Sequence, residues 1–158
     1  RYLLDIIPLS LGTDVKNNST DPEIQKEGSE MSIIIKRGTT IPTFGTETYY
    51  SSSDDQTSMS MNIYEGEKKY VKYIHLLKKS NIAGLTKRPK GKTKVIVKFD
   101  IDVNGILTVD AKEESEDNKG QTLNLVIKND ELSLSPEKIK ELQMKNKELI
   151  ERMISSEC

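Results

Sequence analysis

The sequence predicts a mainly β protein, an antiparallel β-sandwich followed by one C-terminal α-helix. Residues 6–130 contain several short segments in which apolar and polar residues alternate, the pattern of strands with one buried face. Gly, Pro, Asn and Asp separate these segments, as turn residues do. Residues 131–158 instead carry apolar residues at helical spacing. We expect one hydrophobic core, because 158 residues and 17.9 kDa are typical of a single domain.

Composition excludes several classes of protein. The 24 Lys and Arg residues balance 25 Asp and Glu residues, so the net charge of -1 creates no general field for nucleic acid or an anionic membrane. The longest apolar runs, 31–35 and 123–127, are far shorter than the roughly 20 residues of a membrane span. Cys158 is the only cysteine, which excludes a disulfide scaffold. We expect a cytoplasmic protein with no nucleic-acid partner and no membrane segment.

Two candidate strands lie near the N-terminus, at residues 3–7 and 31–36. Pro8 and Pro42 mark strand ends or edges, because proline cannot donate a ladder hydrogen bond. Between the two segments, residues 16–30 are rich in Asn, Ser, Thr, Asp and Glu. We expect a solvated, irregular loop there.

Residues 57–64 form the next predicted strand. Met59, Met61 and Ile63 fall on one face, and small polar residues fall on the other. This alternation indicates a half-buried antiparallel strand whose methionines face an apolar environment. The following YEGE sequence, residues 64–67, closes the strand with a turn.

A β-hairpin is predicted over residues 94–111. The dipeptide Asn104-Gly105 separates two aliphatic, β-branched stretches, and both residues tolerate the positive φ angles of a type I′ turn. Residues 123–127 alternate as one further strand. The acidic segment 113–120 between these strands is expected to be a solvated loop.

The C-terminal helix is predicted from its start signals. Ser135 can cap free backbone amides, Pro136 suits the first turn, and Glu137 favours the positive end of the helix dipole. A narrow apolar face follows, consisting of Ile139, Leu142, Leu149 and Met153.

The sequence gives little support for a catalytic site or a metal-binding site. His75 is the only histidine and lies in a Lys-rich stretch without a motif, so a surface histidine is favoured over a catalytic base. One His and the terminal Cys158 cannot supply a zinc site. Residues 100–105 match the opening of a calcium-binding loop, but Ala111 stands where that loop needs a bidentate Glu. We expect no metal site.

Two further groups of residues allow a binding function. A basic run could meet phosphates, but no aromatic residue is interleaved in it, which favours a solvated loop over a nucleic-acid site. The run consists of Lys87, Arg88, Lys90, Lys92 and Lys94. Met59, Met61, Tyr49 and Val95 form a set of apolar and polarizable side chains on β segments. This set suits a surface for varied apolar ligands, with ordinary core packing as the alternative.

A series of short motifs runs along the chain in order. It begins with PLSLG at 8–12, GTTIPT at 38–43, Asp54 and YEGE at 64–67. It continues with FDID at 99–102, NGIL at 104–107, and Leu134-Ser135 with Glu137 and Ile139. In order and spacing these motifs resemble the substrate-binding domain of the 70-kDa heat-shock chaperones, the DnaK-type family. The resemblance covers most of the chain.

The resemblance implies a molecular chaperone module that binds short extended hydrophobic segments of unfolded polypeptides. Residues 1–5 would end an interdomain linker, 6–130 would form the peptide-binding sandwich, and 131–158 would begin a truncated helical lid. The family implies control by an N-terminal ATPase domain with ATP and magnesium, which this segment lacks, so we expect no enzymatic activity and no cofactor here. J-domain cochaperones and nucleotide exchange factors would act through the full-length protein.

The resemblance also assigns binding residues. The implied pocket consists of Thr13, Val15, Tyr49, Met59, Met61 and Val95. Lys16 and Ser52 would fall where the family builds an arch over the peptide backbone. Asp54 would brace the channel loops, with Lys90 in place of the usual arginine, which loses bidentate geometry.

Departures from the family pattern leave a second function open. The loop between Gly12 and Lys36 is longer than usual, and Thr13 and Lys16 replace apolar residues. A more polar pocket and arch result. The alternative is a chaperone-like regulatory or interaction subunit whose sandwich no longer grips client peptides.

Overall fold

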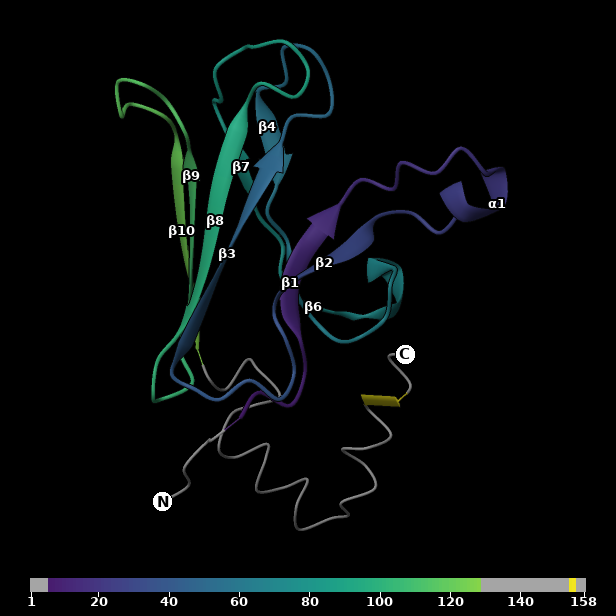
Figure 1. Ribbon diagram of the computed structural model, residues 1–158, viewed down its shortest axis with the longest axis vertical. Helices are drawn as coiled ribbons and strands as arrows, with labels where there is room; N and C mark the ends of the chain where they lie inside the picture. The colour runs from purple at the N-terminus through teal and green to yellow at the C-terminus, as the bar shows by residue number, and fades with distance from the viewer. Residues whose placement is uncertain (1–5, 129–153, 156–158) are drawn as a thin grey trace.

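The computed structural model describes residues 6–128 and 154–155 (Figure 1). The strands are β1 (Leu11–Val15), β2 (Glu30–Ile35), β3 (Thr43–Tyr50), β4 (Ser58–Ser60), β5 (Ile63–Glu65), β6 (His75–Lys78), β7 (Asn81–Ala83), β8 (Lys94–Ile101), β9 (Leu107–Glu113) and β10 (Thr122–Ile127). A short helix, α1 (Pro22–Gln25), and a 3-10 turn, η1 (Val71–Tyr73), interrupt them. The predicted linker over 1–5 and the predicted lid helix over 131–158 lie outside the described residues, apart from 154 and 155.

Two antiparallel sheets form the body of the protein, as the fold class predicts. One sheet has the strand order β2-β1-β5-β6 and the other has the order β10-β9-β8-β3. A two-stranded ribbon of β4 and β7 stands beside them. Figure 1 shows β3, β8, β9 and β10 running together on one side of the molecule and β1, β2 and β6 on the other.

The hydrophobic core explains why these segments become strands. In β8, every second residue is buried, which places Val95, Val97, Phe99 and Ile101 on the inner face. The facing positions of β9 are buried in the same way. Burying one such side chain contributes roughly 1.5–3 kcal/mol, so the alternation itself selects the register. The described core joins residues of both sheets and of the ribbon.

The predicted hairpin is confirmed, but its turn differs from the predicted type. Within this turn Gly105 alone has a positive φ, of 76°, whereas a type I′ turn requires two residues with positive φ. The backbone N–H of Gly105 donates to the carbonyl of Asp102 at 3.0 Å. The Asp102 carboxylate accepts from the N–H groups of Asn104 and Ile106 at 2.8 and 3.0 Å. This carboxylate stabilises a three-residue loop with glycine at its end.

The strand predicted over 57–64 is divided in two. Met59, Met61 and Ile63 are all buried, as the alternation predicts. However, β4 ends at Ser60 and pairs with β7, whereas β5 begins at Ile63 and pairs with β1 and β6. Between them, the Met61 N–H donates to the Ser80 carbonyl at 2.9 Å. The chain therefore passes from the ribbon to the sheet while one face stays buried.

The predicted irregular loop over 16–30 contains an ordered turn of helix. The Asp21 side chain caps α1 by accepting from the Glu23 N–H at 2.9 Å, and Pro22 occupies its first turn. Asn17 Nδ2 donates to the Ile24 carbonyl at 2.8 Å, which closes the segment on itself. Figure 1 shows α1 at the far end of a projection beyond β1 and β2.

The predicted solvated loop over 113–120 begins with a buried residue. Glu113 ends β9 and is 1% exposed, and its carboxylate accepts from Arg88 Nη1 at 2.7 Å. The N–H groups of Thr86 and Gln121 donate to the same carboxylate at 3.0 and 3.1 Å. A buried charge is tolerated there because a guanidinium and two backbone N–H groups donate to the carboxylate. The prediction of a solvated segment is wrong at this residue.

Candidate functional site

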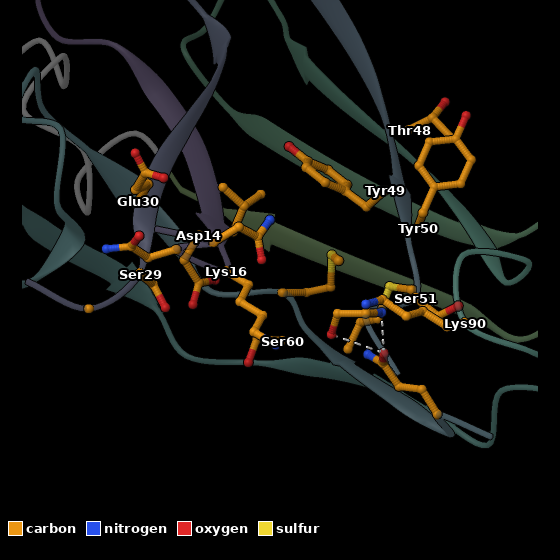
Figure 2. A pocket seen from close by; sticks show the side chains of 18 of the residues that line it. Asp14, Lys16, Ser29, Glu30, Thr48, Tyr49, Tyr50, Ser51, Ser60 and Lys90 are labelled. Atoms are coloured by element: carbon orange, nitrogen blue, oxygen red, sulfur yellow. Dashed lines mark hydrogen bonds between the residues drawn. The ribbon is translucent and has the colours of Figure 1, made fainter. Parts of the chain in front are cut away.

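A cavity of about 990 Å³ opens where the ends of β1, β3 and β4 approach one another (Figure 2). The end of β1 supplies Asp14 and Val15, followed by Lys16. The end of β3 supplies residues 48–50, and β4 supplies Met59 and Ser60. The remaining lining residues are Asn17, Asn18, Gln25, Gly28, Ser29, Glu30, Ser51, Ser52, Gln56, Met61 and Lys90.

Apolar side chains line part of this cavity. Met59 and Met61 are 8% and 2% exposed, and both also belong to the core cluster. Tyr49 packs against that cluster, and Val15 is half-buried at the end of β1. A polarizable thioether adapts to different apolar partners. This region therefore accommodates an aliphatic group without a fixed shape requirement.

Tyr49 is anchored through its phenol. Its hydroxyl shares a hydrogen bond of 2.7 Å with the Ser32 hydroxyl, which joins β3 to β2. Burial raises the pKa of Tyr49 to about 12, so the phenol remains protonated at neutral pH. The ring therefore contributes an uncharged surface to the cavity.

Acidic groups in the cavity are engaged by the protein itself. Burial raises the pKa of the Asp14 carboxyl, although hydrogen bonds from its own backbone, Asn62 and Thr13 oppose the change. The Thr13 hydroxyl lies 3.4 Å from Asp14 Oδ1. Glu30 pairs with Lys69 at 3.6 Å. These two carboxylates are therefore partly compensated before any ligand arrives.

Two of the strands that border the cavity keep an open backbone edge. Among the described residues, β3 is the last strand of its sheet, and β4 pairs with β7 alone. Backbone N–H and C=O groups at such an edge are available to another extended chain. The cavity thus combines apolar side chains with unpaired strand edges.

The sequence was compared with known proteins. A family model described as Hsp70 protein matches residues 2–154. The chain belongs to the Hsp70 family. A heat shock 70 kDa protein of Trichophyton rubrum is 39% identical over 140 residues, which cover 89% of this chain and 19% of that protein.

Two further relatives of this Hsp70-family chain agree. A heat shock 70 kDa protein of Penicillium citrinum is 38% identical over 140 residues, covering 89% of this chain and 25% of the relative. Heat shock 70 kDa protein 2 of Paracoccidioides lutzii is 37% identical over the same length and share of this chain, and 19% of that protein is covered. The chain therefore spans only about a fifth to a quarter of the length of these relatives.

Most of the binding residues that the sequence suggests for this Hsp70 chain come together around the cavity. The lining includes Val15, Tyr49, Met59 and Met61 of the suggested pocket, and both suggested arch residues, Lys16 and Ser52. Thr13 and Val95 do not line it. Both are 0% exposed, Thr13 between β2 and β5 and Val95 between β3 and β9.

The suggested bracing pair is connected through the backbone. The Lys90 N–H donates to Asp54 Oδ1 at 2.8 Å, and the Asp55 N–H donates to the Arg88 carbonyl at 2.9 Å. No ion pair between the Lys90 ammonium and Asp54 occurs among those that the described residues form. The bond that holds these loops together is thus independent of the side chain at position 90.

Sequence reasoning missed the lining residues of the longer loop. They are Asn17, Asn18, Gln25, Gly28, Ser29 and Glu30. Their polar character indicated only a solvated segment. No local sequence pattern predicts that they line the cavity, because their position depends on where α1 lies relative to the strands.

The alternative sites have structural explanations. The Asp102 carboxylate accepts a hydrogen bond from Asn104 within the hairpin turn. Arg88 of the basic run forms an ion pair with Glu113. His75 is exposed, as predicted, and its Nδ1 lies 2.9 Å from the buried Glu65 carboxylate. Across residues 6–128 and 154–155, no group of three or more His, Cys, Asp or Glu could hold a metal ion, and no helix is long and apolar enough to cross a membrane.

Proposed function

We propose that the cavity binds a short extended segment of an unfolded polypeptide, with an aliphatic side chain placed against Met59, Met61 and Tyr49. The observation that carries this proposal is the position of these side chains beside the open edges of β3 and β4. Strand edges recognise any peptide backbone, whereas the apolar surface selects the side chain. Together they describe a receptor for many unfolded sequences.

The expected affinity is modest. Burying one leucine side chain contributes roughly 1.5–3 kcal/mol, and the backbone hydrogen bonds contribute roughly 0.5–1.5 kcal/mol each. Ordering the peptide opposes both contributions. We therefore expect an affinity in the micromolar range or weaker.

In the full-length protein this module serves a molecular chaperone. An N-terminal ATPase domain that uses ATP and magnesium controls it, a helical lid beginning at 131–158 closes over it, and residues 1–5 end the linker between the domains. J-domain cochaperones and nucleotide exchange factors act through the full-length protein in the cytoplasm. Membership of the Hsp70 family supports these assignments.

A peptide titration tests the proposal. A fluorescently labelled, extended, Leu-rich peptide is titrated with the protein, and fluorescence anisotropy reports binding. A matched peptide in which Ser replaces every Leu serves as the control. Saturable binding of the Leu peptide alone is expected. Equal binding of both peptides, or of neither, would favour the alternative of a regulatory or interaction subunit that does not grip clients.

A further inference from the structure

Two lysines on the cavity wall form no ion pair with any of residues 6–128 and 154–155. Lys16 and Lys90 both line the cavity and both are exposed. The lysine ion pairs formed by the described residues involve Lys26, Lys69, Lys72, Lys94 and Lys98. Neither Lys16 nor Lys90 is among them, although both stand at a site suited to a peptide.

The two cations lie on opposite sides of the cavity. Lys16 follows β1, whereas Lys90 belongs to the loop before β8. Figure 2 shows them apart, one toward the wall that carries Asp14 and Glu30 and the other beside Ser51. An extended chain crossing the cavity would thus meet a cation near each end of its path.

The carboxylates of the lining do not cancel this charge. Glu30 is compensated by Lys69, which does not line the cavity. Asp14 is half-buried and accepts a hydrogen bond from Thr13. The other polar lining groups are amides and hydroxyls. The lining thus sets two exposed lysines against one half-buried carboxylate, Asp14, that no ion pair of the described residues compensates, so the charge open to a ligand is positive on balance.

We propose that Lys16 and Lys90 form a cationic rim that selects extended peptides carrying acidic residues on both sides of an aliphatic residue. This inference rests on the proposed function and adds a charge preference to it. The reason is complementarity: a flanking Glu or Asp gains an ammonium partner that the folded chain does not use, whereas a flanking Lys is repelled.

The size of the preference follows from the exposure of both lysines. An exposed ion pair changes an affinity by a factor of about 1.4 to 5. Two such pairs give a ratio of about 2 to 25 between Glu-flanked and Gln-flanked peptides at low salt. At about 0.5 M sodium chloride the Debye length is only a few ångströms. Screening by salt should therefore remove most of this preference.

Three labelled peptides of equal length and the same central leucine, flanked by Glu, Gln or Lys, test the inference by anisotropy. The order of affinity expected is Glu, then Gln, then Lys. Lys16→Gln and Lys90→Gln should each reduce the Glu-to-Gln ratio by about twofold. Lys92→Gln is the matched control, because Lys92 lies on the same loop as Lys90, is exposed and does not line the cavity.

The outcomes separate this inference from the proposed function. Equal affinities for the three peptides would overturn the cationic rim, and so would an effect of Lys92→Gln as large as that of Lys16→Gln or Lys90→Gln. The proposed function would still stand in either case, provided that the Gln-flanked peptide binds. Failure of all three peptides to bind would overturn both. Melting temperatures of the variants confirm that each remains folded.

Discussion

At the scale of single residues, the cavity and the core share side chains. Met59 and Met61 belong to the hydrophobic cluster and also line the cavity. A charge at Met59 would therefore damage folding and binding together, since an unpartnered buried charge is costly. Val15 separates the two effects better, because it lines the cavity and is only half-buried.

We predict that Val15→Asp weakens binding of the Leu-rich peptide by about tenfold or more and changes the melting temperature little. The new carboxylate would face an apolar ligand without a partner. Val126→Asp is the control, because Val126 is 49% exposed on a strand that does not line the cavity. Anisotropy and thermal melting measure both properties, and equal losses of affinity in the two variants would contradict the assignment.

Glu113 is predicted to be a stability determinant. Glu113→Gln should lower the free energy of unfolding by about 1–3 kcal/mol, because the buried acceptor for Arg88 and two backbone amides loses its charge. Glu114→Gln is the matched control. Its side chain is 54% exposed and pairs with Lys94 at 3.6 Å, so a change of about 0–1 kcal/mol is expected in chemical denaturation.

The same residue gives a pH prediction. Burial would raise the pKa of Glu113, but hydrogen bonds from Arg88, Gln121 and Thr86 outweigh it and lower the pKa below the ordinary 4.5. The stabilisation is therefore complete above that value and is lost as pH falls through the folded pKa. Unfolding curves of the wild type and Glu113→Gln should converge in strong acid. A gap that persists there would show that the charge is not responsible.

Some residue positions follow from the sequence and others do not. The buried face of Met59, Met61 and Ile63 follows from strict alternation, because side chains on a strand repeat every two residues. The resemblance assigns Thr13 and Val95 to the pocket, and Val95 also belongs to the apolar set found on the β segments, yet both are fully buried between strands and do not line the cavity. Cavity lining depends on how three separate segments meet, which alternation does not encode.

At the scale of elements, the long loop over 16–30 shows the limit of local patterns. Ile24 is almost its only apolar residue, so the local pattern indicates a solvated segment. The structure instead fixes it through a distant segment: the Glu27 carboxylate pairs with Lys72 at 3.1 Å and accepts from the Tyr73 hydroxyl at 2.9 Å. Lys72 Nζ also donates to the Lys26 carbonyl at 3.2 Å. These contacts join positions 45 or 46 residues apart, which no local pattern predicts.

We predict that Glu27→Gln loosens this loop without unfolding the sandwich. The hydrogen bond from Tyr73 and the contact with Lys72 lower the pKa of Glu27, so its carboxylate is charged at neutral pH and supplies both interactions. Hydrogen exchange of the amides in 17–28 should become faster, whereas exchange in β8 and β9 should not change. Glu23→Gln is the control, because its partner Lys26 lies within the loop itself. Faster exchange in that variant too would implicate helix α1 rather than the contact with Lys72.

At the scale of the whole molecule, the two sheets enclose one core formed by residues from 7 to 127. Local alternation and turn signals predict β2, β10 and the β8-β9 hairpin, whereas no such pattern in the sequence predicts β3, β6 or β7. The sequence does not predict that β3 pairs with β8, or that β1 lies between β2 and β5. Those pairings join distant segments, and only burial of both inner faces selects among the possible orders.

The closed core leads to a prediction about the boundary of the folding unit. A chain ending at residue 128 should unfold cooperatively, with a melting temperature within a few degrees of the full chain, since it retains every residue of the described cluster. Circular dichroism and chemical denaturation measure this. The shorter chain should also keep the preference for Leu over Ser peptides, because it retains every lining residue of the cavity.

A chain ending at residue 121 is the control for that boundary. It lacks β10, whose Ile127 is 0% exposed and whose Leu123 and Leu125 pack against the core. Without β10, the full length of β9 becomes an open edge and apolar core surface meets water. Cooperative melting should disappear in this chain. If the chain ending at 128 also melts without cooperativity, the folding unit extends beyond the sandwich, and residues 129–158 contribute to its stability directly.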